Sequence, residues 1–405
     1  MSKLERYEMT FHRHGLPTVQ HKAGLGGLVY LLKHLEGREL PQEERVEFEV
    51  SKDELRLALT SESLTRLMSE LYQNMTVVRT SRSKPKGEYW EEERELSNGK
   101  TEKIFKYKDS RPRGGWLFEG LKPGAEQAIA AGEDDWHKLW QDSLWQTFRG
   151  IPATRKVFDT DKGKEKVVKD FWKAFEKKEK GKPVTLDIAS TIYVGAQAQN
   201  PEGIGFEGSP DEVFLLHFAQ VLAQPYKVVG VDSQGGTYWP GVIWVFLEPG
   251  NLKRFVKKCK GFLAGRKVGD PDFRLRSRVT LPQEAALGIL SDEALKLTLE
   301  DAGELAFDGA LCTHLNKEGN NINLYAASYV PYEQNLISDY REVVLSIQSY
   351  PVRKLCLQNL LDGKPLYRGA SKLLSYLPKE AAVPLSGLGN SISRDSKTIL
   401  EKVEQ

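Results

Sequence analysis

Apolar and polar positions follow two different periods along this chain, and together they predict both strands and helices. Residues 6–11 are apolar at every second position, which is the period of a strand with one buried face. Residues 22–35 are apolar at every third or fourth position, which is the period of a helix with one buried face. The same reasoning predicts further strands at residues 46–50, 184–194 and 323–330, and further helices at residues 63–72, 134–148, 211–223, 251–263, 339–347 and 351–361.

Two hairpins are predicted where turn residues separate alternating segments. An Asn-Gly pair at residues 98–99 separates residues 88–96 from residues 101–108, and this pair is the strongest short signal for a hairpin turn. Residues 226–231 and 237–247 flank a second turn that contains two glycines. Both arms of the first hairpin are highly charged, so we expect it to project into solvent or over a partner.

The predicted fold class is α+β. We expect mixed sheets and hairpins in the N-terminal and central regions, followed by a mainly helical C-terminal region. A length of 405 residues suggests about two to three domains. We place them at residues 1–113, 114–281 and 282–405.

Three glycines crowd one end of the predicted helix at residues 22–35. Gly24, Gly26 and Gly27 each cost about 1 kcal/mol relative to alanine inside a helix, so their presence implies a compensating contact. Tight packing against another helix would explain them, and so would close approach of a ligand. Both interpretations stay open at this point.

Composition narrows the class of protein before any motif is considered. No apolar run approaches the roughly 18 residues that a membrane-spanning helix needs. The first residues lead into no apolar segment, so we expect no secretory signal. Cys259, Cys312 and Cys356 lie far apart, which excludes a disulfide scaffold or a zinc ribbon and fits a reducing, cytoplasmic location.

The formal net charge of +2 conceals strong local clustering of charge. Residues 253–278 contain ten basic and two acidic residues, and residues 162–182 contain nine lysines and four acidic residues. A basic surface most often binds a polyanion. We therefore predict contacts with a nucleic-acid backbone from Lys253, Arg254, Lys257, Lys258, Lys260, Arg266, Lys267, Arg274, Arg276 and Arg278.

The basic clusters also allow two interpretations that involve no nucleic acid. Either cluster could be a solvated face, and the carboxylates in residues 162–182 can pair with lysines four positions away. Alternatively, the basic surface could belong to a scaffold that binds an acidic protein.

The sequence contains little catalytic chemistry. It lacks the phosphate-binding, serine-hydrolase and zinc-protease motifs, and its glycine-rich segment lacks the dinucleotide-binding spacing. His12 and His14 could share one face of a strand as metal ligands, but no cluster of cysteines or carboxylates completes a site. Cys312 and His314 lack a third orienting group, and we expect His217 to be a hydrogen-bonded histidine of the core. We predict no metal and no cofactor, and keep a metal-dependent nuclease as the alternative function.

A glycine-rich segment at residues 195–208 carries side-chain amides. Gln197, Gln199 and Asn200 follow a predicted strand, and amides of this kind can read the edges of bases. The neighbouring glycines would let the backbone approach a ligand closely. Asn200 precedes Pro201, so a simple role in a turn is the competing interpretation.

Two separate stretches of the sequence together resemble a known family. One is Leu16-Pro-Thr-Val-Gln-His-Lys-Ala-Gly-Leu-Gly-Gly-Leu28. The other is Gly195-Ala-Gln-Ala-Gln-Asn-Pro-Glu-Gly-Ile-Gly-Phe206, followed by Val213-Phe-Leu-Leu-His-Phe218. The pair resembles the CRISPR-associated large-subunit family of type I Cascade complexes, in its Myxan-type, type I-B-like branch, over the first two thirds of the chain.

The resemblance implies a non-catalytic subunit of an RNA-guided DNA-binding complex. Such subunits lie near the 5′ end of the guide RNA, read the protospacer-adjacent motif (PAM) on duplex DNA, and help to form the R-loop. Guide pairing then reads the target sequence, while protein reads the PAM and the backbone. The positions carried over from the two motifs are Gln20 and Lys22 in the first, and Gln197, Gln199 and Asn200 in the second.

The implied partners are the guide RNA, the target duplex DNA and the other Cascade subunits. A helicase-nuclease or a transposition adaptor would act downstream. Members of the family usually end in a helical bundle, whereas residues 391–405 indicate only the beginning of a charged helix. The sequence names neither the PAM nor the downstream partner.

Overall fold

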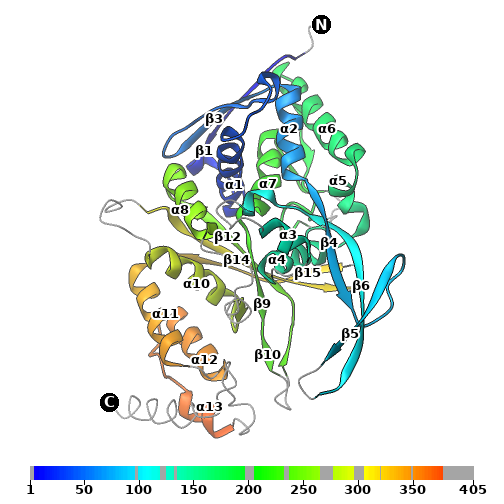
Figure 1. Ribbon diagram of the computed structural model, residues 1–405. Helices are drawn as coiled ribbons and strands as arrows, with labels where there is room; N and C mark the ends of the chain where they lie inside the picture. Colours follow the sequence, from blue (N-terminus) through cyan, green and yellow to red (C-terminus); the bar gives the residue numbers. More distant parts are fainter. Residues whose placement is uncertain are drawn as a thin grey trace.

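The computed structural model describes residues 4–95, 99–118, 125–131, 135–196, 205–231, 237–264, 277–295, 305–319, 321–347 and 350–376. It has an α+β fold, as predicted, in which several antiparallel sheets are covered by helices (Figure 1). Strands and helices both contribute to one continuous apolar core.

A five-stranded sheet lies at the centre of the molecule (Figure 1). Its strand order is β13-β9-β12-β14-β15, and only the β13–β9 pair is parallel. Its strands are β9 (Gln224–Val228), β12 (Val242–Pro249), β13 (Arg278–Val279), β14 (Phe307–Glu318) and β15 (Asn321–Pro331). Every residue of β12 is buried, as expected for a central strand that is covered on both faces.

Two three-stranded sheets are built from the N-terminal part of the chain. The first contains β1 (Tyr7–His12), β2 (Glu47–Val50) and β3 (Glu54–Leu59); the second contains β4 (Asn74–Ser81), β5 (Tyr89–Glu95) and β6 (Thr101–Pro112). In the second sheet, β5 and β6 form the predicted hairpin, which projects away from the body of the molecule (Figure 1). Ion pairs such as Lys103–Glu91 and Lys106–Glu92 join its arms.

The remaining strands form two short ladders, β7 (Leu186–Asp187) with β8 (Glu207–Gly208) and β10 (Gly230–Val231) with β11 (Thr237–Tyr238). The helices are α1 (Val19–Glu36), α2 (Ser61–Leu71), α3 (Ala125–Ala130), α4 (Asp135–Gln146), α5 (Lys156–Asp159), α6 (Asp161–Glu179), α7 (Pro210–Leu222), α8 (Leu252–Ala264), α10 (Pro282–Leu295), α11 (Gln334–Ser346), α12 (Tyr350–Leu361) and α13 (Ala370–Tyr376). Short 3₁₀ turns lie at η1 (Arg13–Gly15), η2 (Gln42–Glu44), η3 (Gly115–Phe118) and η4 (Pro152–Arg155).

Close packing of α1 against α7 explains the glycines of α1. A Cβ atom added at Gly24 would lie 2.2 Å from the Leu215 carbonyl oxygen, and one added at Gly27 would lie 2.2 Å from the Phe218 carbonyl oxygen. At Gly26 the added atom would lie 2.5 Å from the Phe255 ring of α8. The glycines therefore let α1 pack directly against its neighbours, which supports the packing interpretation over the ligand interpretation.

Two predictions of secondary structure were wrong. Of the strand predicted at residues 184–194, only Leu186–Asp187 forms a ladder, because residues 189–196 make successive turns. In the C-terminal region, the sequence predicted only the strand at residues 323–330 and missed β14. The central residues of β14 are small and buried, so they show no clean alternation of apolar and polar positions. The domain boundaries near Gly114 and Leu281-Pro282 stay predictions.

The α1–α7 contact can be tested with Gly24→Ala. Helix propensity alone favours alanine by about 1 kcal/mol. The new methyl group would instead collide with the α7 backbone, so we expect a net loss of about 1–3 kcal/mol in the free energy of unfolding, measured in urea. Gly15→Ala is the control, because a Cβ there meets no atom within 4 Å. A Gly24→Ala variant as stable as the wild type would contradict this packing.

His137 of α4 gives the fold a pH dependence. The side chain is fully buried and its Nε2–H donates to the Arg113 carbonyl oxygen at 2.8 Å. Burial lowers the pKa of His137 to about 4, so the folded state keeps it neutral. The unfolded chain takes up this proton near pH 6.5, so this contribution to stability is present above pH 6.5 and is lost as the pH falls toward 4.

His137→Gln removes the titrating group and retains a donor. We expect the variant to lose less stability than the wild type between pH 6.5 and pH 4, by roughly 1 kcal/mol per pH unit, in urea unfolding at a series of pH values. Parallel stability curves for the two proteins would contradict this assignment.

Candidate nucleic-acid interface

At the N-terminal end of α1, the first sequence motif contacts the turn that directly precedes the second motif. Gln20 is buried, and its Oε1 accepts a hydrogen bond from the Val194 backbone N–H at 3.2 Å. The rings of His21 and Tyr193 lie beside each other, with centroids 6.0 Å apart. Thr18 caps the helix by accepting from the His21 backbone N–H. This part of α1 therefore holds the turn that leads directly into the amide segment.

The amides of that segment, Gln197, Gln199 and Asn200, lie outside the described residues. The described chain reaches them through Gly195, whose φ of +94° requires glycine. Their predicted contact with bases stays a prediction.

Lys22 lies two residues after Gln20 on α1 and is already paired within the protein. Its Nζ donates to Glu248 Oε1 at 2.6 Å, at the end of β12, where the glutamate is almost completely buried. Gln20 and Lys22 thus join α1 to the turn and to the central sheet. The structure gives both side chains a positioning role, and their predicted contact with bases stays untested.

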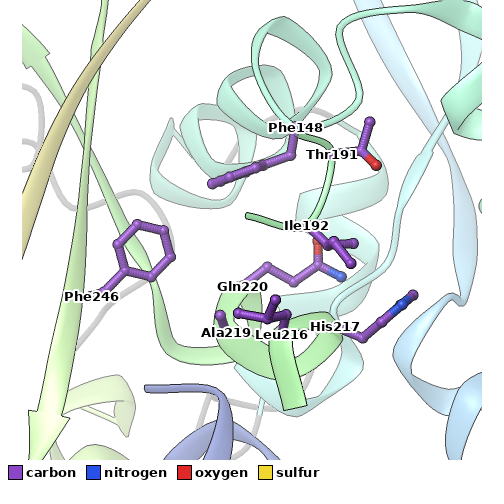
Figure 2. Close-up of a pocket in the computed structure, with 8 residues that line it drawn as sticks. All are labelled: Phe148, Thr191, Ile192, Leu216, His217, Ala219, Gln220 and Phe246. Atoms are coloured by element: carbon purple, nitrogen blue, oxygen red, sulfur yellow. The ribbon is translucent and has the colours of Figure 1, made fainter. Parts of the chain in front are cut away.

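A small pocket separates the turn from α7. Figure 2 shows Thr191 and Ile192 of the turn on one side, and Leu216, His217, Ala219 and Gln220 of α7 on the other. Gln220 is 7% exposed and its amide reaches toward Ile192 (Figure 2). The space suits a water molecule better than a nucleobase.

His217 is the hydrogen-bonded histidine that the sequence predicted. Its Nδ1 contacts the Tyr72 hydroxyl, and its ring packs edge-on against Phe171. Burial, with a smaller contribution from the nearby Arg149 guanidinium, lowers the pKa of His217 to about 3. The side chain is therefore neutral and supports α7.

The basic helix α8 presents a stripe of lysines. Asn251 caps it, with its Oδ1 accepting from the Arg254 backbone N–H at 3.1 Å. Lys253, Lys257 and Lys260 are exposed at the spacing of one helix face. On the opposite face Phe255, Cys259 and Leu263 are buried, while Arg254 and Lys258 lie at intermediate exposure. Among the residues that the structure describes, Lys253 and Lys257 have no acidic partner within 4 Å.

The remaining predicted cations divide into two groups. Arg266, Lys267, Arg274 and Arg276 lie outside the described residues. Arg278 starts β13, where its guanidinium lies over the Trp239 ring, 4.9 Å from the centroid. In α6 the predicted pairing is present, with Lys169 Nζ 3.3 Å from Glu165 Oε2.

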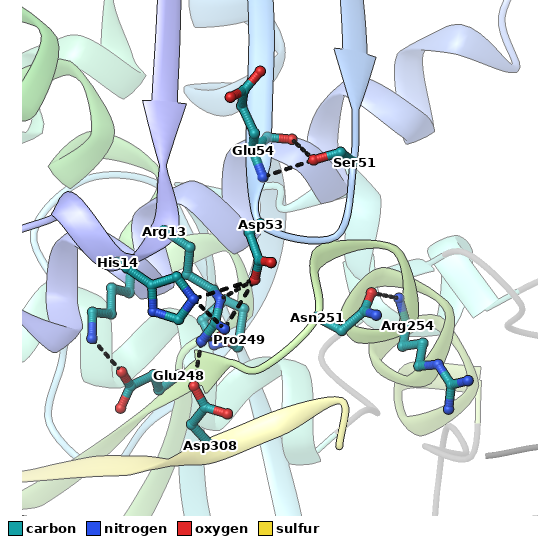
Figure 3. A network of polar contacts seen from close by, with 11 residues as sticks. Arg13, His14, Ser51, Asp53, Glu54, Glu248, Pro249, Asn251, Arg254 and Asp308 are labelled. Atoms are coloured by element: carbon teal, nitrogen blue, oxygen red, sulfur yellow. Dashed lines mark hydrogen bonds and ion pairs between the residues drawn. The ribbon is translucent and has the colours of Figure 1, made fainter. Parts of the chain in front are cut away.

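A buried arginine fixes the start of α8. Arg13 donates to Asp53 Oδ1 at 3.0 Å, to the Pro249 carbonyl oxygen at 3.0 Å, and to Asp308 (Figure 3). Leu252, the first residue of α8, donates its backbone N–H to the Lys52 carbonyl oxygen at 2.9 Å. The cluster of Arg13, Asp53 and Asp308 therefore ties η1, the β2–β3 turn, the end of β12 and β14 together beside α8.

The candidate metal ligands have other partners. His12 Nδ1 lies 2.9 Å from Glu54 Oε2, and His14 Nε2 lies 2.9 Å from an Arg13 nitrogen. Within the described ranges, no group of three or more His, Cys, Asp or Glu side chains could hold a metal ion. Cys312 is buried, which raises the pKa of its thiol to about 12, and His314 contacts the Pro240 carbonyl oxygen. Cys312 and His314 thus do not form an activated pair.

Sequence reasoning missed the partners of two cations. Arg13 was overlooked between His12 and His14, although alternation along β1 could have indicated that residues 11 and 13 point inward. Trp239 was overlooked because its neighbour in space, Arg278, lies far away in the sequence. Separately, among the described helices none is long and apolar enough to span a membrane.

The role of Arg13 can be tested with Arg13→Met. Removing the guanidinium leaves two carboxylates and one carbonyl oxygen without their shared donor. Because Asp53 and Asp308 are each about 40% exposed and can rehydrate, we expect a loss of only about 1–3 kcal/mol in urea unfolding. The control is Arg6→Met, which removes an exposed arginine that pairs with Glu8 and Glu47. Equal, small losses of unfolding free energy in both variants would show that Arg13 does not stabilise the contacts among η1, the β2–β3 turn, β12 and β14.

Comparison with known families extends over most of the chain. The type I-B CRISPR Cas8b N-terminal domain matches residues 46–301, and the type I-B CRISPR Cas8b C-terminal domain matches residues 308–405. The match thus continues beyond the first two thirds, to which the resemblance in sequence was confined. A search of curated proteins found no match. The chain belongs to the Cas8b family, the large subunits of type I-B CRISPR Cascade.

Proposed function

We propose that this subunit reads the PAM on duplex DNA and helps to form the R-loop, without itself catalysing a reaction. The observation that carries the proposal is the contact between Gln20 of the first motif and Val194, which directly precedes the second motif although it lies 174 residues further along the chain. A buried anchor of this kind supports a segment of glycines and amides, and such a segment suits the reading of base edges.

The same helix also supports a surface for the DNA backbone. The Phe255 ring of α8 packs against Gly26 of α1, so the amide segment and the lysine stripe are both attached to α1. Phosphate contacts orient a protein on DNA, whereas amides in a groove distinguish bases. Residues for both tasks are thus supported by one rigid element.

The partners follow from membership of a Cascade complex. We propose that the subunit acts in the cytoplasm with a guide RNA, target duplex DNA and the other Cascade subunits, and that a helicase-nuclease or a transposition adaptor acts downstream. A metal-dependent nuclease is not proposed, because His12 and His14 are engaged with Glu54, Arg13 and Asp53.

The test uses the assembled complex with its guide RNA and duplexes that differ only in the motif beside the target. We expect Gln199→Ala or Asn200→Ala to change the preference among motifs, because an amide that distinguishes bases contributes about 1–3 kcal/mol of discrimination. Unchanged motif preference in both variants would overturn the assignment of base reading to this segment.

Lys257→Glu tests the backbone contacts separately. We expect it to weaken binding to all duplexes alike and to reduce the slope of log affinity against log salt by about one. The control is Lys103→Glu, which makes the same change of charge at an exposed lysine that pairs with Glu91 on the projecting hairpin. If Lys257→Glu and Lys103→Glu behaved alike, α8 would not be the backbone surface.

A further inference from the structure

An exposed tryptophan and an arginine form a compact pair at one end of the central sheet. Trp239 follows β11 and is 46% exposed, and the Arg278 guanidinium lies over its ring. The arginine is held by the sheet, because Ser277 accepts from the Lys227 backbone N–H at 2.8 Å and Val279 accepts from the Val229 N–H at 2.9 Å. These hydrogen bonds fix the backbone that carries Arg278.

The guanidinium of Arg278 and the exposed face of Trp239 are both available to bind a ligand. Among the described residues, the Arg278 guanidinium has no carboxylate or hydrogen-bond partner, although it carries five N–H donors. A single exposed tryptophan is ordinary, but one that is covered in part by an unpaired arginine offers an aromatic face beside a phosphate-binding fork. Four of the predicted backbone cations also precede Arg278 closely in the sequence, at residues 266, 267, 274 and 276.

This combination suits unpaired nucleotides rather than a duplex. In a duplex both faces of an internal base are covered by neighbouring bases, whereas an unpaired base can stack on an aromatic ring while its phosphate meets a cation. A partner protein with acidic side chains would use the arginine but would leave the tryptophan face without a specific role.

We propose that Trp239 and Arg278 form a stacking site for an unpaired base and its phosphate. This proposal rests on the proposed function, because R-loop formation supplies unpaired nucleotides. They could come from the guide RNA or from the displaced DNA strand, and these share the same stacking chemistry.

The full chain, without guide RNA, is titrated against labelled oligothymidylate and oligouridylate of about 15 nucleotides and against a duplex of similar length. We expect Trp239→Ala to weaken single-strand binding about tenfold and Trp239→Phe to retain most of it, because stacking contributes about 1–3 kcal/mol per base. Arg278→Ala should reduce the salt slope by about 0.7, whereas Trp239→Ala should leave this slope unchanged. The oligonucleotide that shows the larger loss with Trp239→Ala identifies the strand.

Two exposed aromatic residues provide matched controls. Trp90 on β5 is 42% exposed, and Tyr238 is 51% exposed but lays its ring over Gly230 of the paired strand. Neither Trp90→Ala nor Tyr238→Ala should weaken single-strand binding. The proposal is overturned if Trp239→Ala binds as the wild type does, if Trp90→Ala loses as much, or if duplex binding falls equally.

Failure of this site can be distinguished from failure of the proposed function. Motif preference is measured on duplex DNA with the assembled complex, and it depends on residues 197–200 rather than on the aromatic pair. If motif preference depends on the amides but single-strand binding is insensitive to Trp239, only the stacking site is wrong. If the complex shows no motif preference but single-strand binding depends on Trp239, only the PAM assignment is wrong.

Discussion

Direct backbone contact between α1 and α7 is the constraint on which the rest of this structure depends. Ordinary side chains keep two helix axes about 8–10 Å apart, and glycine allows a closer approach. Gly24 and Gly27 allow it toward α7, and Gly26 makes room for the Phe255 ring of α8. Because α1 also holds Val194 through Gln20 and Glu248 through Lys22, its position bears on the turn before the amide segment, on the end of β12 and on α8.

Much of this fold could be predicted from periodicity and turn chemistry. The helices with one apolar face and the first hairpin carry local signals, and the structure confirms them. The strand expected at residues 184–194 failed because its apolar residues pack from a series of turns, which leave the same apolar pattern as a strand. In β14, Gly309, Ala310 and Cys312 are small and buried, so alternation has too little contrast to be detected.

The candidate interface could be predicted only where its members are neighbours in the sequence. The lysines of α8 were found because they lie within a few helical turns. By contrast, Arg13 with Asp308 and Arg278 with Trp239 are pairs that only the tertiary fold creates. Several other arginines serve the interior: Arg79 binds Gln141, and Arg149 lies over Tyr72 and Phe158. Net charge therefore says little about where a chain of this kind binds a polyanion.

The central sheet also shows whether the chain could be cut into two separately folding fragments at the boundary between the two domain matches. Strands β9 and β12 belong to the match with the N-terminal Cas8b domain, and β14 and β15 belong to the match with the C-terminal domain. Strand β12 pairs with β14 along its whole length, and Arg13, which precedes the N-terminal match, pairs with Asp308 in the C-terminal match. Two separately expressed halves would each expose a long apolar strand edge, and such edges aggregate. The boundary between the two domain matches thus reflects relatedness in sequence, whereas the strands on both sides of it form one sheet.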